Sequence, residues 1–163
     1  MSDQDTVALI ELMFFAYRDF VSDPDEILSQ FGFGRAHHRV VHFVGRDPGM
    51  TVQQLLDILR ITKQSLGRVL KELIDKGYVY QKEGETDRRQ RLLYLTPKGG
   101  ELRQRLMTPQ MNRIRRAVSL PDGNAAHAYR KVLYHMVSPE NREAVRDWID
   151  RASLLGEGNR KGG

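Results

Sequence analysis

The sequence predicts a mostly α-helical protein that carries one small β-hairpin. Apolar residues recur at helical spacing over most of the 163-residue chain. Two short segments rich in β-forming residues, 78–82 and 92–96, are the exception. The segment between them is charged, rich in turn-forming residues and longer than a two-residue hairpin turn, so the loop should project from the protein.

The composition fits one compact domain, or one domain with a dimerisation extension. Hydrophobic residues make up 40% of the chain, which excludes a disordered protein, and the net charge of +5 favours polyanionic partners, nucleic acid before anionic membrane. Cysteine is absent, which excludes disulfides and thiolate metal sites. No apolar run reaches the ~18–20 residues that span a bilayer, and the N-terminus is acidic, so a soluble cytoplasmic protein is expected.

Residues 6–21 have the length of a helix and are apolar almost all the way round. Such a helix must be covered on most faces, either at the centre of a core or by a partner subunit. Because the segment is terminal, we expect a subunit interface. Asp23-Pro24 and Phe31-Gly32-Phe33-Gly34 are expected to interrupt the chain before the next helix.

Two helices are expected next. The first covers residues 35–45 and is ended by the turn residues Asp47-Pro48-Gly49. The second opens at Thr51, which forms a capping box with Gln54 three residues later.

A break at Arg60-Ile61 precedes a third helix, which is capped by Thr62 and stops at Gly77. Its apolar stripe belongs to the core, which leaves long hydrogen-bond donors facing outward near its N-terminus. Two short helices separated by a tight break, and followed by a projecting hairpin, indicate a winged helix-turn-helix. This module places one helix in a DNA groove.

Pro97 begins a long helix in the position where proline is tolerated, and Pro109 is expected to kink or interrupt it. Two further helices follow Leu120-Pro121-Asp122-Gly123 and the start signal Ser138-Pro139-Glu140. The predicted organisation is a winged helix-turn-helix DNA-binding region at 35–96, a helical dimerisation region formed by 1–34 and 97–155, and a disordered tail at 156–163.

The outward face of the third helix suits a major groove. Arg68 matches O6 and N7 of guanine, and Gln64 matches N6 and N7 of adenine. Thr62 and Ser65, beside the unpaired N–H groups of the first turn, suit a phosphate. A solvated helix face with incidental charges would look the same, so the assignment depends on the hairpin as well.

The hairpin loop is rich in arginine, and an arginine on a projecting hairpin can enter a minor groove. Asp87 and Arg89 lie two apart, so on an extended segment the carboxylate would orient the guanidinium. The alternative is a solvated turn held by weak surface ion pairs. The predicted DNA-binding residues are Thr62, Lys63, Gln64, Ser65, Arg68, Lys71, Arg88, Arg89 and Arg91, with Asp87 as the wing-orienting residue.

Four groups of residues carry a family resemblance: the run 59–70, Gly77-Tyr78-Val79, Asp87-Arg88-Arg89 and Leu95-Thr96-Pro97-Lys98-Gly99. Over roughly residues 35–106 the chain resembles the MarR (multiple antibiotic resistance regulator) family. The resemblance implies a homodimeric bacterial transcriptional regulator that binds a pseudo-palindromic operator. It also implies a dimer interface formed by the terminal helices and a small aromatic effector bound between the two subdomains.

In this family, residues 62–71 would form the recognition helix, and Arg89, oriented by Asp87, would be the wing contact. Many wings of the family carry an extra aspartate before the turn, where this chain has Gly84 and Glu85. The detailed conformation of the wing is therefore expected to differ from that pattern.

His38 and His42 are spaced i, i+4, which can present two imidazoles to one metal. No Asp, Glu or Cys joins them at a useful spacing, so polar residues at a helix surface or interface are the favoured interpretation. Arg35 and His38 are candidates for an effector pocket. The chain has no Gly-rich phosphate loop after a strand, no G-x-S-x-G and no H-E-x-x-H, so no enzyme activity, cofactor or metal is predicted.

Two other classes of function fit parts of the sequence. A winged helix used for protein–protein contact would keep the fold but would need no groove-facing donors, and Lys63, Gln64 and Arg68 argue against it. Attachment to an anionic membrane would need a basic amphipathic helix with a clean aromatic face, which the chain lacks.

Overall fold

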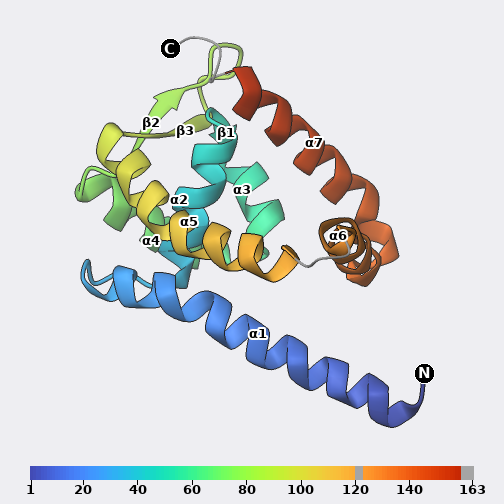
Figure 1. Cartoon of the computed structure of the whole chain (residues 1–163). Helices are drawn as coiled ribbons and strands as arrows, with labels where there is room; N and C mark the ends of the chain where they lie inside the picture. The colour runs from blue at the N-terminus through green and yellow to red at the C-terminus, as the bar shows by residue number, and fades with distance from the viewer. Residues whose placement is uncertain (120–122, 159–163) are drawn as a thin grey trace.

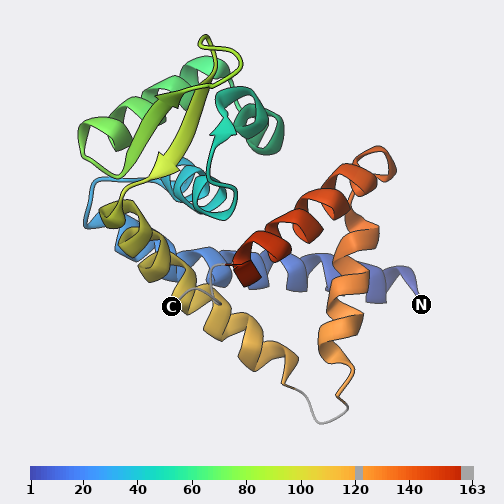
Figure 2. The same ribbon diagram turned by 90° about the horizontal axis from the view of Figure 1, so that it is seen from above.

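A computed structural model of the chain describes residues 1–119 and 123–158 (Figure 1). The elements are α1 (Asp3–Ser29), α2 (Arg35–Arg46), β1 (Met50–Thr51), α3 (Val52–Leu59), α4 (Lys63–Asp75), β2 (Val79–Glu83), β3 (Arg91–Leu95), α5 (Pro97–Val118), α6 (Ala125–Met136), the 3-10 turn η1 (Pro139–Asn141) and α7 (Arg142–Gly158). The strands form one antiparallel sheet in the order β1-β3-β2. The sheet, α2, α3 and α4 group together, while the first half of α1 and helix α6 extend away from them (Figure 2). The predicted fold class, a mostly helical winged helix-turn-helix, is confirmed.

The predicted capping signals are confirmed. Thr51 Oγ1 accepts the N–H of Gln54 at 3.1 Å, and Gln54 Oε1 accepts the N–H of Thr51 at 2.8 Å. At the start of α4, Thr62 Oγ1 accepts the N–H of Ser65 at 3.1 Å. Gly77, with φ +76°, follows α4 in the left-handed region that favours glycine. Local chemistry therefore sets both ends of the helix-turn-helix.

The predicted hairpin is confirmed as β2 and β3, with Val79 opposite Leu95. The third strand, β1, was not predicted. It pairs Met50 with Leu93 on the other side of β3. A strand of two residues is too short to show an alternating pattern, so sequence periodicity could not reveal it.

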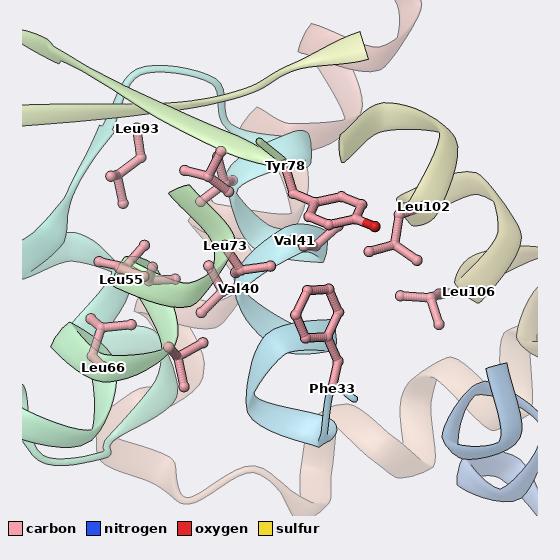
Figure 3. Close-up of a cluster of buried hydrophobic side chains, with 14 of the residues drawn as sticks. Phe33, Val40, Val41, Leu55, Leu66, Leu73, Tyr78, Leu93, Leu102 and Leu106 are labelled. Carbon is pink, nitrogen blue, oxygen red and sulfur yellow. The ribbon is translucent and has the colours of Figure 1, made fainter. Parts of the chain in front are cut away.

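Helix α2 lies at the centre of the core (Figure 3). Its side chains Val40, Val41 and Val44 have no exposed surface. Buried side chains from the other helices and the sheet surround them: Leu28, Leu55, Leu66, Leu73, Leu93, Leu102 and Leu106. One continuous core thus joins the helix-turn-helix to α1 and α5.

The expected interruption at Asp23-Pro24 is wrong, because α1 continues through it. A proline inside a helix removes the N–H that would bond the carbonyl four residues earlier, here that of Phe20. Gln110, on α5, donates its Nε2–H to this carbonyl at 3.3 Å. Arg113 Nη2 also pairs with Asp23 at 3.0 Å. Helix α5 supplies the bond that Pro24 removes, and α1 remains one helix.

The C-terminal expectations are partly corrected. Helix α5 is not interrupted at Pro109. It bonds to α1 on both sides of the proline, through Arg105 to Gln30 at the end of α1 and through Gln110 to Phe20. The signal at Ser138-Pro139 opens η1, and α7 follows it. Residues 120–122 of the expected break lie outside the described residues. Helix α7 extends three residues into the expected tail, whose residues 159–163 are not described.

His42 packs where α2 meets α5. Arg103 Nε donates to the His42 carbonyl at 3.4 Å. The Nδ1 atom of His42 is buried and has no hydrogen-bond partner in the described part of the chain. Burial first, and then the neighbouring charges of Arg103, His38 and Arg46, lower the pKa of His42 to about 4.

We expect Gln110→Met to lower the free energy of unfolding by about 1 kcal/mol, since the Phe20 carbonyl would lose its partner in a partly buried place. Pro24→Ala restores a main-chain N–H that can bond the Phe20 carbonyl, so Gln110→Met should lower the free energy of unfolding by less in that background. The double variant should therefore lose less stability than the two single losses combined. Urea unfolding at one fixed protein concentration measures this, and strictly additive losses would contradict the compensation.

We expect the protein to lose stability as the pH falls. Below the ordinary pKa of about 6.5 the unfolded chain binds a proton at His42 that the folded chain does not bind until its pKa near 4. Between pH 7 and pH 5 this linkage amounts to about 2 kcal/mol. His42→Met should unfold with a flatter pH dependence in the same buffers. His127→Met, on the exposed face of α6, should keep the wild-type slope.

Candidate nucleic-acid interface

One side of helix α4 packs in the hydrophobic core, and the other side is exposed. Its apolar side chains are buried in the core: Leu66, Val69, Leu70 and Leu73. At its start, Thr62 also donates its hydroxyl to Ser65 Oγ at 2.8 Å. The N–H groups of Lys63 and Gln64 come before the first intrahelical bond, so they can bind an anion.

The predicted groove residues on α4 are all exposed, but they differ in whether the side chain is paired with a carboxylate. Lys63, Gln64 and Arg68 are exposed, and all three carry long donor side chains. Lys71 is exposed as well, but its Nζ lies 2.6 Å from Asp75 Oδ2, one turn further along the helix. The free donors therefore belong to the first half of α4.

Gly67 lies in the same exposed half. A Cβ atom at this position would meet nothing within 4 Å. No neighbouring helix therefore requires glycine here. The missing side chain leaves the surface of α4 low between Gln64 and Arg68, where a large partner can approach the helix closely.

The hairpin loop, residues 84–90, is ordered by its own main chain. Gly84 N–H donates to the Gln90 carbonyl, and Gln90 N–H donates to the Asp87 carbonyl, both at 3.1 Å. Asp87 Oδ1 accepts the main-chain N–H of Arg89 at 2.9 Å. The expectation that this carboxylate would hold the Arg89 guanidinium is corrected, because the loop is a turn and not an extended strand.

The three predicted wing arginines also divide. Arg91 Nη1 lies 3.3 Å from Glu83 Oε1 and 3.3 Å from the Arg88 carbonyl, so it links the two strands where the loop begins. Arg88 and Arg89 are exposed, and neither pairs with a carboxylate in the part of the chain that the structure describes. Two guanidinium groups are thus available at the tip.

The candidate effector residues lie at the start of α2. Arg35 donates through Nε and Nη2 to the Asp25 carboxylate, with a shortest distance of 2.8 Å, and thereby ties α2 to α1. His38 is half-buried, and burial lowers its pKa. A cavity of about 510 Å³ lies between α3 and α7, and another of about 690 Å³ lies among α5, α6 and α7. Neither cavity is lined by Arg35 or His38.

Two contributors to the interface were not predicted. A Cβ at Gly84 would lie 2.6 Å from the Asp87 carbonyl oxygen, so the wing turn needs glycine there. Arg60, between α3 and α4, adopts a left-handed conformation with φ +50°. The predicted break at Arg60-Ile61 placed this turn, but an arginine gives no sequence signal for a positive φ.

Within the described ranges, no group of three or more histidine, aspartate or glutamate side chains is placed to hold a metal ion. None of the helices in those ranges combines the length and apolar character needed to cross a membrane.

Comparison with known proteins identifies the family. A sequence model of the MarR family matches residues 31–90. The HTH-type transcriptional regulator PetP of Rhodobacter capsulatus is 46% identical over 142 residues, which cover 87% of this chain and 86% of that protein.

Solved structures share the fold. The transcriptional regulator SlyA superposes with a TM-score of 0.66 at 15% identity, covering 86% of this chain and 96% of its own. A mutant of MarR from E. coli, crystallised with operator DNA, superposes with a TM-score of 0.61 at 20% identity, covering 84% of this chain and 100% of its own. The chain belongs to the MarR family of winged helix-turn-helix, DNA-binding transcriptional regulators.

Proposed function

We propose that the protein is a homodimeric, sequence-specific regulator that places α4 in the major groove of an operator and the 84–90 loop in the adjacent minor groove. One observation carries the proposal. The first half of α4 exposes three long donors while its apolar side is wholly committed to the core.

In this arrangement Arg68 donates both arms of its guanidinium to a guanine, and Gln64 reads an adenine. Lys63, Thr62 and the first-turn N–H groups of α4 bind a phosphate, which fixes the register of the helix on the duplex. Gly67 lets the helix sit close to the groove, because no side chain stands between its backbone and the DNA.

The wing supplies charge without base specificity. Arg88 and Arg89 occupy the minor groove, where the potential of DNA is most negative. Asp87 acts on them through the main chain, because its bond to the Arg89 N–H fixes the turn. Arg91 keeps the two strands of the hairpin together through Glu83. Lys71, paired with Asp75, adds long-range attraction rather than a base contact.

The exposed surface of the single chain supports a dimer. Its accessible area is 11762 Å², against about 8,300 Å² expected for a compact monomer of its mass. The single chain therefore exposes more surface than a compact monomer would, and an obligate homodimer interface of about 2,000–5,000 Å² over both subunits would cover part of that excess. Exposed apolar side chains line α1, at Val7, Leu9, Ile10, Leu12, Met13, Phe14, Phe15 and Tyr17, and α6, at Tyr129, Val132, Leu133 and Met136.

A two-fold dimer would present two copies of α4 to half-sites about one helical turn apart, so the operator is pseudo-palindromic. A small-molecule effector would act by favouring one separation of the two copies over another. The name of the relative PetP, an HTH-type transcriptional regulator, and the crystallised complex of E. coli MarR with operator DNA support this assignment. A winged helix used only for protein contact would leave the free donors of α4 and the wing without a role.

Binding to duplex DNA over a salt series tests the proposal. Fragments selected from a genomic pool supply the operator, and fluorescence anisotropy gives the affinity. The logarithm of affinity should fall linearly with the logarithm of salt concentration, with a slope of about −0.9 for each phosphate contacted. Binding that is absent, or that does not depend on salt, would refute the regulator.

The two kinds of contact should separate in single variants. Arg89→Ala should weaken binding to every duplex about equally, whereas Arg68→Ala should in addition lose ~1–3 kcal/mol of discrimination at one base pair. Arg116→Ala, exposed near the end of α5, is the control and should bind like the wild type. If Arg68→Ala kept the base preference intact, α4 would not be the reading helix.

The dimer has its own test. Light scattering after size exclusion should give twice the chain mass for the wild type at micromolar concentration. Ile10→Glu with Phe14→Glu places two charges on the exposed apolar face of α1 and should give monomers, because a buried unpaired charge is strongly unfavourable. Glu11→Gln is the neighbouring control. A wild type that elutes as a clean monomer would contradict the dimer.

A further inference from the structure

The C-terminal helix α7 lies beside α3, the first helix of the helix-turn-helix of its own chain (Figure 1). It reaches this unit from α6, which extends away from the sheet, and its own first residues follow η1. Three contacts join the segment to the winged helix, and each comes from a different part of it. None of the three involves a side chain that is proposed to touch DNA.

The first contact holds the turn between α3 and α4. Arg60 Nη2 donates to Asn141 Oδ1 at 2.7 Å, across 81 residues of sequence. Arg60 has the only positive φ among the non-glycine residues described. A left-handed conformation is unfavourable for a residue with a side chain, so the turn needs support from its surroundings, and Asn141 binds the end of the Arg60 side chain.

The second contact holds the other end of α3. Arg151 Nη2 lies 3.2 Å from Asp47 Oδ2, across 104 residues of sequence. Asp47 ends α2, and its carbonyl accepts the N–H of Met50 at 3.1 Å in the turn that leads into α3. This carboxylate is 19% exposed and the Arg151 side chain is 55% exposed, so solvent screens the pair mainly from the arginine side.

The third contact is aromatic. The rings of Trp148 and Phe43 meet edge to face at 5.1 Å. Trp148 is the only tryptophan of the chain, and its Nε1 is buried without a hydrogen-bond partner in the described residues. Its fluorescence therefore reports on the surroundings of this one residue of α7.

Between the contacts, α7 and α3 are not fully packed. The cavity of about 510 Å³ lies there and is lined by Gln54, Ile58 and Trp148 among others. Where close packing is missing, orientation depends on the contacts at the ends. Helix α3 has eight residues, and α7 with η1 binds the residues on either side of it.

We propose that α7 and η1 position the helix-turn-helix for DNA binding, with Asn141, Trp148 and Arg151 as positioning residues that act through Arg60, Phe43 and Asp47. The inference rests on the proposed function as a DNA-binding regulator. Because α4 follows directly from the Arg60 turn, fixing α3 at both ends fixes the direction in which α4 leaves it. Losing the contacts lets α4 sample other directions, and the affinity for DNA falls because the ordering must then occur on binding.

A charge exchange tests the proposal in the full-length dimer. Arg151→Glu sets two carboxylates against each other and should shift the emission of Trp148 to longer wavelength as α7 undocks. The same variant should weaken operator binding about tenfold, the scale of a coupling of ~1.4 kcal/mol. Adding Asp47→Arg restores the pair with opposite polarity and leaves the net charge of the protein at the wild-type value. The double variant should recover most of both signals.

A second pair of variants removes one hydrogen bond without introducing a repulsive charge, so it is less prone to misfold. Asn141→Ala and Arg60→Ala should each weaken binding several-fold, and together no more than the stronger of the two, because they remove one bond. Glu140→Ala, an exposed neighbour in η1, is the matched control and should bind like the wild type. Sizing of each variant shows whether the dimer persists.

The outcomes separate the two claims. If the wild type fails to bind DNA, the proposed function fails. If the wild type binds, the inference is overturned by any one of three results: Trp148 emission unchanged in Arg151→Glu, emission shifted with unchanged or tighter DNA binding, or weaker binding explained by loss of the dimer. Shifted emission and weaker binding that both recover in the double variant, with the dimer intact, support it.

Discussion

The packing of α2 at the centre of the core is the constraint on which the rest of the structure depends. Helices α1, α3, α4, α5 and α7 and strand β3 all pack against it. With Val40, Val41 and Val44 completely covered, each of these elements occupies a position that its neighbours also define. The winged helix therefore has no core of its own, and its orientation relative to α1 and α5 is part of the same packing.

This shared core decides which side chains are available for chemistry. Helix α4 gives its apolar face to α2, so the side chains that remain exposed are the polar ones. The turns that carry these side chains are set by short polar contacts and by backbone conformation. The Thr62 cap fixes where α4 begins, the Asp87 carboxylate fixes the wing turn, and Arg60 ends α3 in a left-handed conformation. Specific hydrogen bonds thus order the turns at the surface, while close packing of apolar side chains orders the core.

Much of the fold could be predicted because its signals are local. Capping residues, glycine stops and helical periodicity involve neighbours within a few positions, and they placed α2, α3, α4 and the hairpin correctly. The continuation of α1 through Pro24 could not be predicted, because the compensating donor, Gln110, lies 90 residues from the carbonyl that it bonds. Strand β1 is too short to show a pattern.

The residue types of the candidate site could also be predicted, but not all of their partners. The two-residue spacing of Asp87 and Arg89 suggested a side-chain pair, whereas the turn brings the carboxylate to the main chain. In the sequence Arg91 and Lys71 look like free cations, but both are paired in the structure.

The continuity of α1 has a mechanical consequence, since its 27 residues make a rod ~40 Å long. If α1 tilts by ~5° about its exposed N-terminal end, its C-terminal end, which packs against α2 and α5, moves by ~3.5 Å. This displacement is close to the ~3.4 Å step between neighbouring base pairs of DNA.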